Sequence, residues 1–181
     1  MFTDWTMLRL LPPLRAMWAA VGTQAEVAIT GQNAKRVLFG TINVRTAWRT
    51  VYVGRSAGAH EVRAFLLALR KAYRRAGTIW LLADRASGHT AQATLALAQE
   101  LRIEFVWLPR QWPELNAMDQ LWKELKRDVA ANRQAVSIDD LADRASQRVL
   151  NLTPVQARRK SGMASAKFWL RSLSQDFWLP T

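Results

Sequence analysis

The sequence of 181 residues contains no cysteine, which excludes disulfide bonds and thiolate metal sites and favours a reducing cytosol. It also lacks a recognisable signal peptide or membrane span, because charged residues and prolines interrupt the apolar stretch at residues 1–21. No internal repeat, low-complexity tract or long linker divides the sequence. We therefore expect one domain over residues 1–181.

Acidic residues are scarce relative to basic ones. Asp and Glu number 14 against 26 Lys and Arg, so the formal net charge is +12. Such a charge concentrates polyanions around a protein, and nucleic acid is the obvious partner. Half of the residues are hydrophobic and nine are Trp, so this charge decorates a packed domain rather than a disordered basic tail.

The first half of the chain predicts a hairpin followed by a helix. Residues 36–43 and 48–53 are rich in β-formers and flank a short polar turn, which is typical of an antiparallel hairpin. In residues 60–76 the apolar positions recur at intervals of three and four, which predicts an amphipathic helix that ends at Gly77.

The next segment predicts a strand–helix–strand unit. Residues 78–84 and 103–109 are short apolar runs of the kind that buried strands show, and residues 90–101 between them are rich in alanine. A helical connection of this length implies a parallel strand pair with a right-handed crossover. Further helices are expected at residues 116–132, 137–150 and beyond 153. The fold class is therefore α/β, with a mixed sheet, an N-terminal antiparallel hairpin region and helices packed on it.

Two aspartates occupy positions where a fold of this class exposes ligands. Asp84 ends an apolar strand, and ligands gather at the carboxyl ends of strands in open α/β sheets. A turn or helix cap would also explain an aspartate there. Asp119 lies three residues after Asn116, an expected N-cap, so it falls in the first helical turn and interacts with the helix dipole. A surface pair with Lys123 would contribute only a few tenths of a kcal/mol.

Asp4 extends this set, although taken alone it reads as an ordinary exposed acid. Hard divalent cations such as Mg²⁺ prefer carboxylate oxygens, and phosphoryl transfer uses two ions about 3.5 to 4 Å apart. The three aspartates together therefore predict a site for phosphodiester chemistry on nucleic acid.

Four other residues near these acids are candidates for supporting roles. His89 is suited to contacting a scissile phosphate or orienting a water molecule, and capping the following helix is an equal alternative. Asn116 is suited to positioning the site, and capping explains it equally well. Trp107 and Trp112 flank a turn near the proposed site, where they could stack on a base or pack in the core.

Basic residues on two expected helices are candidates for contacts with DNA phosphates, which would make binding sensitive to salt. The alternative for each is a solvated side chain on a helical face. The candidates are Arg63, Arg70, Lys71, Arg74, Arg75, Lys123, Lys126 and Arg127.

Five blocks of sequence in one order resemble the bacterial insertion-sequence branch of the mariner-type DDE transposases. They are DWTMLRLLPPLRAMW with VGTQ, RVLFGTINVRT, LLADRASGHT, VWLPRQWPELNAMDQLWKELK with ANRQ, and SGMASAKFWL. The resemblance implies a ribonuclease H-like fold with Asp4, Asp84 and Asp119 as the metal-binding acidic triad. It also implies two Mg²⁺ or Mn²⁺ ions, strand cleavage and strand transfer on double-stranded DNA at element ends and target, and a homodimer in the active assembly. Its location would be the bacterial cytoplasm, at the nucleoid.

The sequence departs from the family pattern in two places. Relatives commonly carry an acidic residue directly after the first catalytic aspartate, where this chain has Trp5. They also carry an N-terminal helix-turn-helix region that recognises transposon ends, so we expect this chain to correspond to the catalytic domain alone. A catalytically impaired DNA-binding remnant is the alternative function, and a ribonuclease H-like enzyme acting on RNA or recombination junctions ranks behind it.

Overall fold

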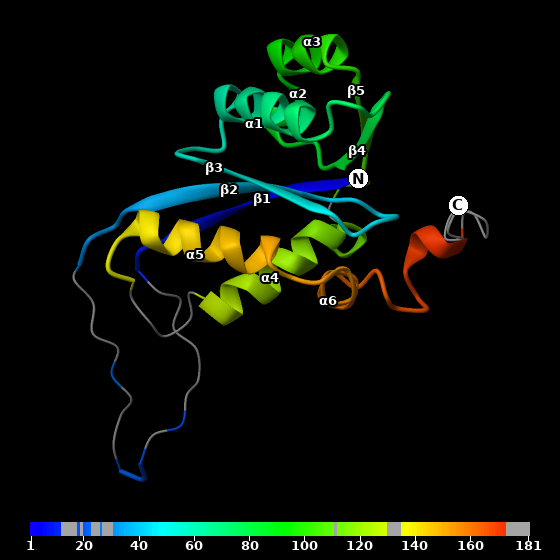
Figure 1. The fold of residues 1–181 in the computed structure, drawn as a ribbon. Helices are drawn as coiled ribbons and strands as arrows, with labels where there is room; N and C mark the ends of the chain where they lie inside the picture. Colours follow the sequence, from blue (N-terminus) through cyan, green and yellow to red (C-terminus); the bar gives the residue numbers. More distant parts are fainter. Residues whose placement is uncertain are drawn as a thin grey trace.

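A five-stranded mixed sheet forms the centre of the molecule (Figure 1). The computed structural model describes residues 1–11, 18, 20–22, 26, 31–110, 112–129 and 135–172. The strands lie in the order β3-β2-β1-β4-β5. Their bounds are Phe2–Arg9 (β1), Lys35–Ile42 (β2), Arg49–Gly54 (β3), Ile79–Ala83 (β4) and Ile103–Trp107 (β5).

Strand β1 joins an antiparallel part of the sheet to a parallel part. It pairs antiparallel with β2, and β2 pairs antiparallel with β3, which confirms the expected hairpin. On its other side β1 runs parallel to β4, and β4 runs parallel to β5, as the strand–helix–strand pattern predicted. The central position of β1 explains why it contacts elements from both halves of the chain.

Helices cover both faces of the sheet (Figure 1). Helices α1, α2 and α3 lie on one face, and α4, α5 and α6 lie on the other. None of the helices in the described ranges is long and apolar enough to cross a membrane. The bounds are Ala59–Ala72 (α1), Ser87–Thr90 (α2), Gln92–Glu100 (α3), Ala117–Val129 (α4), Ile138–Leu150 (α5) and Pro154–Lys160 (α6), with 3-10 turns at Pro113–Leu115 (η1) and Trp169–Ser172 (η2).

Two expected helices differ from their predicted bounds. Helix α1 ends at Ala72 rather than at residue 76, because Tyr73 leaves the helical conformation and the Arg70 guanidinium binds the carbonyls of Tyr73, Ala76 and Gly77. The helix expected at residues 90–101 is α3, Gln92–Glu100, and it is preceded by the short helix α2, from which the extended backbone at Ala91 separates it.

The other predicted helices agree with the structure within a few residues. Helix α5 begins after Ser137, whose hydroxyl accepts a hydrogen bond from the Asp140 amide. Helix α6 begins after Thr153, where a capping box with Gln156 is complete. Residues 130–134, which include the end of the helix expected at 116–132, lie outside the described residues, as do residues 173–181.

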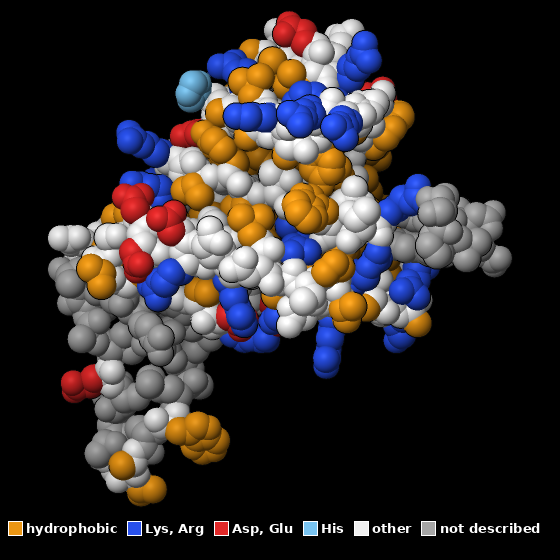
Figure 2. Space-filling view, in the orientation of Figure 1, with side chains coloured by type: hydrophobic (Ala, Val, Ile, Leu, Met, Phe, Trp, Pro, Cys, Tyr) orange, Lys and Arg blue, Asp and Glu red, His pale blue; other side chains and the backbone are white. Residues whose placement is uncertain are grey.

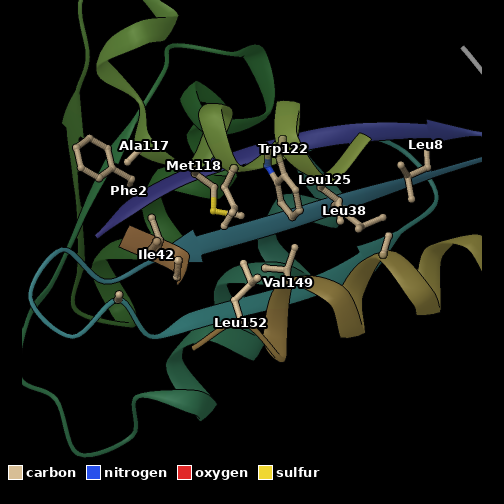
Figure 3. Packing of buried hydrophobic residues seen from close by; sticks show 14 of the residues in the cluster. Phe2, Leu8, Leu38, Ile42, Ala117, Met118, Trp122, Leu125, Val149 and Leu152 are labelled. Atoms are coloured by element: carbon tan, nitrogen blue, oxygen red, sulfur yellow. The ribbon is translucent and has the colours of Figure 1, made fainter. Parts of the chain in front are cut away.

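Each face of the sheet buries its own hydrophobic cluster. Alternate residues of β2 point to opposite faces, so Val37 and Phe39 pack with α1, and Leu38 and Ile42 pack with α4 and α5. Figure 3 shows the second cluster, in which side chains of α4 lie against the strands. Burial of each large side chain contributes about 1.5–3 kcal/mol, so the two clusters hold both helical layers on the sheet.

Helix α4 packs closely on Gly40 of β2. A Cβ atom at this position would lie 2.5 Å from Met118 Cε and 2.6 Å from Trp122 Cζ2. Both side chains belong to α4 and are buried, and Figure 3 shows them beside Ile42 on the same face of the sheet. The missing side chain of Gly40 therefore sets the distance between α4 and the sheet.

We expect Gly40→Ala to lower the free energy of unfolding by about 1–3 kcal/mol, because the added methyl group overpacks the contact with the Trp122 ring. Urea denaturation would measure the loss. Gly77→Ala is the matched control, since a Cβ there meets nothing within 4 Å, and we expect a change within about 0.5 kcal/mol. Equal effects of the two substitutions would contradict the close-packing argument.

Candidate active site

Three separate elements bring the three aspartates to one cavity of about 460 Å³. Asp4 lies on β1, Asp84 follows the last residue of β4, and Asp119 lies in the first turn of α4. The strand register accounts for the first two. Phe2 is level with Leu82 in the parallel pair β1–β4, so Asp4 and Asp84, each two residues further on, reach the same end of adjacent strands.

The alternation of β1 side chains directs Asp4 to the α4 face. Phe2 and Leu8 are buried in the cluster under α4, and Asp4 shares their parity along the strand. Trp5 has the opposite parity and packs against the cluster under α1. The residue after Asp4, where this sequence departs from the family pattern, therefore points away from the cavity.

Asn116 connects the strand that carries Asp4 to the helix that carries Asp119. Its Oδ1 accepts a hydrogen bond from the Met118 amide at 3.0 Å, and its Nδ2 donates to the Thr3 carbonyl oxygen, also at 3.0 Å. The side chain is 4% exposed, so both bonds are shielded from water. The expected N-cap is present, and the same amide group also fixes the start of α4 against β1.

His89 is buried and holds Asp84. Its Nδ1 lies 2.9 Å from Asp84 Oδ1 and 3.2 Å from the Asp84 carbonyl oxygen, and since both are acceptors, Nδ1 carries a proton. The ring is 2% exposed and packs 5.8 Å from the Phe105 ring. The caps of α2 and α3 are Ala86 and Ala91, so the geometry gives His89 an orienting contact rather than a capping one.

The carboxylates at the cavity differ in their affinity for protons. The pKa of Asp4 is raised to about 7, mainly by burial and also by the negative charges of Asp119 and Asp84, against the opposing effects of the Trp5 amide and His89. The hydrogen bond from His89 lowers the pKa of Asp84. Without a cation, a substantial fraction of Asp4 is thus protonated at neutral pH, while Asp84 is ionised.

Asp119 forms an ion pair with a lysine of its own helix. Lys123 Nζ, one turn along α4, lies 2.8 Å from Asp119 Oδ2. This contact is an ion pair without the alignment of a hydrogen bond, and Oδ2 is buried with no hydrogen-bond partner in the described part of the chain. The Lys123 side chain is 55% exposed, so it can move away when another cation binds the carboxylate.

The oxygen ligands at the cavity suit hard divalent cations. Asp4, Asp84 and Asp119 supply carboxylate oxygens only, and a buried carboxylate pushed towards protonation gains stability from a cation. Among the described residues, no three acidic or histidine side chains converge closely enough to bind a single ion. The three carboxylates therefore lie around the cavity rather than at one common point. Electrostatic repulsion between them favours this distance from one another.

Two arginines at the cavity were not among the sequence candidates. Arg85 directly follows Asp84, and Arg110 follows β5, so both extend from the strand ends that build the site. The guanidinium of Arg85 lies 5.4 Å from the centre of the Trp107 ring, which stacks on Phe105. The signal that locates both arginines is their position just beyond a parallel strand.

The aromatic candidates beside the site differ in exposure. Trp112 lines the cavity and is 55% exposed. Trp107 is half-buried and stacks parallel to Phe105 with ring centres 5.0 Å apart. Trp107 therefore packs at the edge of the sheet, whereas the face of Trp112 is open to a ligand.

The basic candidates at and just beyond the end of α1, Arg70, Lys71, Arg74 and Arg75, lie away from the cavity. The chain runs from the end of α1 to the first residue of β4, whereas Asp84 follows the last residue of that strand. The five residues of β4 span roughly 17 Å, and this length separates the end of α1 from Asp84. Arg70 is half-buried and binds backbone carbonyls, so its guanidinium has a structural use. The side chains of Lys71, Arg74 and Arg75 are exposed, and that of Arg63 is half-buried.

The basic candidates on α4 lie closer to the acids. Lys123 contacts Asp119, Lys126 is half-buried two turns from it, and Arg127 pairs with Glu124 and Asp128. Figure 2 shows Lys and Arg side chains spread over both helical layers on the visible face. The positive charge on this face is therefore spread over both layers, and Lys123 contacts an acid that lines the cavity.

The sheet order and the two helical layers define a ribonuclease H-like fold, as the resemblance implied. The chain belongs to the family of DDE superfamily endonucleases, whose family model matches residues 1–142. The catalytic domain of Mos1 mariner transposase has a similar structure, with a TM-score of 0.64 and 12% identity over 99% of this chain and 84% of that chain. The mariner Mos1 paired end complex with Mg matches with a TM-score of 0.71 and 15% identity, over 99% of this chain and 56% of that chain.

A protein of an insertion element gives a match in sequence. The IS630 uncharacterized 39 kDa protein of Shigella sonnei is 27% identical over 154 residues, which cover 84% of this chain and 45% of that protein. The chain thus spans about half the length of this curated relative. The expected DDE family is confirmed by the family model, and the insertion-element protein and the Mos1 mariner structures are similar to this chain, as the expected mariner-type, insertion-sequence branch implies.

We expect Asn116→Ala to lower the free energy of unfolding by about 2–3 kcal/mol, because it removes a helix cap and leaves the Thr3 carbonyl unpaired. Ser137→Ala is the matched control, since Ser137 caps α5 through one hydrogen bond, and its loss should cost about 1 kcal/mol. Urea denaturation would compare them. Equal losses would show that the bond to β1 contributes nothing.

In EDTA, we expect Asp4→Asn to stabilise the protein by about 1–3 kcal/mol above about pH 7 and to have little effect near pH 4. The pKa of Asp4 rises from 3.8 to about 7 on folding, so the folded state binds more protons between these values. Wild-type stability therefore contains a contribution that is present below about pH 4 and lost as the pH rises through 7.

Chemical denaturation across this pH range would measure the difference between the Asp4→Asn variant and the wild type. Asp143→Asn, at an exposed position of α5, is the control for removing one acidic group. A difference for Asp4→Asn that does not vary with pH would contradict the assignment.

Proposed function

We propose that residues 1–181 form the catalytic domain of a DDE transposase that cuts DNA at the ends of an insertion element and joins the freed ends to target DNA. The observation that carries the proposal is the assembly of Asp4, Asp84 and Asp119, from three separate elements, around one cavity. Family membership and the insertion-element relative support the reaction class. The helix-turn-helix region of relatives would lie outside these residues.

The three aspartates would hold two Mg²⁺ or Mn²⁺ ions through their carboxylate oxygens. Bound ions of this kind lower the pKa of an attacking oxygen and neutralise charge at phosphorus. His89 keeps the Asp84 carboxylate ionised and fixed in orientation, and Asn116 fixes the distance between the elements that carry Asp4 and Asp119. The paired-end complex of Mos1 described as containing Mg supports the choice of ion.

Arg85 and Arg110 would bind the phosphate that enters the cavity. Both guanidinium groups belong to residues that line it, and a guanidinium matches the oxygens of a phosphodiester in a bidentate contact. Their charge offsets the repulsion between the DNA and the three carboxylates. Since they lie beyond adjacent strands, they can hold the scissile phosphate while the aspartates face it.

The substrate would be double-stranded DNA, at the element ends and at the target, in the bacterial cytoplasm at the nucleoid. The net charge of +12 supports a polyanionic partner. A homodimer would be the active assembly, because joining two element ends to one target needs two active sites.

We expect the purified chain to nick supercoiled plasmid in Mg²⁺ or Mn²⁺, and Asp84→Ala to reduce the rate on the order of 100-fold or more, because one ligand of the ions is lost. Gel electrophoresis of the plasmid over time would measure the rate. EDTA should abolish nicking by the wild type. Asp143→Ala, which removes an exposed acid of α5, should nick at the wild-type rate.

The same assay separates the enzyme from the inactive remnant. Tight DNA binding by the wild type without metal-dependent nicking would indicate a remnant and contradict the proposal. Nicking that survives Asp84→Ala would place the chemistry elsewhere.

A further inference from the structure

A second cavity, of about 410 Å³, lies beside the candidate active site. One side consists of η1 and the start of α4, and the other consists of the end of α6 and the turn that follows it. We call it the α6 groove. Its polar lining includes Glu114, Gln120, Arg159, Lys160 and Lys167.

The α6 groove and the acidic cavity share a wall. In η1 and the residue before it, Trp112 and Pro113 line the acidic cavity, and the next residue, Glu114, lines the groove. In the first turn of α4, Asp119 faces the cavity and Gln120 faces the groove. Consecutive Cα atoms are about 3.8 Å apart, so the wall between the two cavities is about one residue thick at these points. A strand of nucleic acid that extends across this wall from the acidic cavity would enter the groove.

The α6 groove is held in a fixed position relative to Asp4. Trp169 Nε1 donates a hydrogen bond to the Leu115 carbonyl oxygen at 3.0 Å, which joins the two sides of the groove. The rings of Phe168 and Trp169 pack edge-on against Phe2, with centres 6.0 and 6.2 Å apart. Phe2 precedes Asp4 by two residues on β1. The same strand therefore carries the first acid and packs against the Phe168 and Trp169 side of the groove.

The charge of the α6 groove is predominantly positive. Arg159 and Lys167 are exposed, and neither forms an ion pair within the described ranges of the chain. Lys160 Nζ forms ion pairs with Glu124 Oε2 at 3.5 Å and with Asp128 Oδ2 at 3.4 Å. Glu114 is the acidic member of the lining. Two cations without acidic partners therefore lie next to a cavity that is itself lined by three aspartates.

We infer that the α6 groove binds the phosphodiester backbone of the DNA strand that runs through the acidic cavity, with Arg159 and Lys167 contacting phosphates beside the scissile one. This inference rests on the proposed function. The guanidinium of Arg159 is suited to a bidentate phosphate contact, and the ammonium of Lys167 supplies a mobile point charge. These contacts would hold the strand beyond the wall that the two cavities share, in addition to the contacts with Arg85 and Arg110 within the acidic cavity.

The test is the salt dependence of DNA binding by the full chain in EDTA. Fluorescence anisotropy of a short labelled duplex would be recorded between about 50 and 200 mM salt for the wild type and for the double variant Arg159→Gln/Lys167→Gln. Loss of two phosphate contacts should reduce the slope of log affinity against log salt by about 2 and weaken binding at low salt about tenfold or more.

Two matched variants control for charge and for folding. Arg55→Gln/Arg102→Gln removes two exposed arginines near the far edge and the opposite end of the sheet, and should leave the slope unchanged. Arg159→Lys/Lys167→Arg keeps both charges and should keep the slope. An unchanged slope for the Gln double variant, or an equal reduction in the Arg55 and Arg102 pair, would overturn the inference.

The binding slope and plasmid nicking separate the two proposals. A reduced slope in a protein that does not nick DNA upholds the α6 groove while the proposed catalytic function fails. Nicking that depends on Asp84, together with an unchanged slope, overturns the groove alone. Absence of DNA binding by the wild type overturns both.

Discussion

The contact between the start of α4 and strand β1 determines whether the site exists. Asp4 and Asp119 are far apart in sequence, and one buried amide, that of Asn116, bonds both to the first turn of α4 and to the Thr3 carbonyl. Gly40, opposite Asp4 in the neighbouring strand, lets α4 lie close to the sheet. The third acid, Asp84, needs only the parallel register of β4 with β1. The chemistry thus depends on one helix being held at one distance from one strand.

This arrangement has an electrostatic cost that a cation would relieve. Three carboxylates around one cavity repel one another, and burial together with the charges of Asp119 and Asp84 raises the pKa of Asp4 to about 7. The protein meets the cost with a hydrogen bond from His89 to Asp84 and an ion pair from Lys123 to Asp119. The histidine is buried and fixed, whereas the lysine is largely exposed. The first contact is therefore suited to orienting a ligand, and the second is readily exchanged for a bound cation.

The sequence predicted the elements better than their junctions. Strands and helices with clear apolar periodicity, such as the hairpin and α5, were predicted within about two residues, because burial of an apolar face dictates both pattern and structure. The break at Ala91 and the early end of α1 depend on an extended alanine and on the Arg70 guanidinium, which no local pattern signals. At the site, the sequence indicated all three aspartates, but it missed Arg85 and Arg110, since their relevance follows from which strands are adjacent.

The alternation of β1 explains why a departure from the family pattern next to the first aspartate need not alter the site. Side chains of a strand point alternately to its two faces, so residues 4 and 5 belong to different environments. Asp4 faces α4 and the cavity, whereas Trp5 packs with the cluster that supports α1. An acid at position 5 would point to that same α1 face, where it would have to reach the cavity around the edge of the strand. The Trp5 side chain therefore stabilises the layer opposite the site, and the contact of Trp5 with the carboxylates is the hydrogen bond from its backbone amide, which lowers the pKa of Asp4.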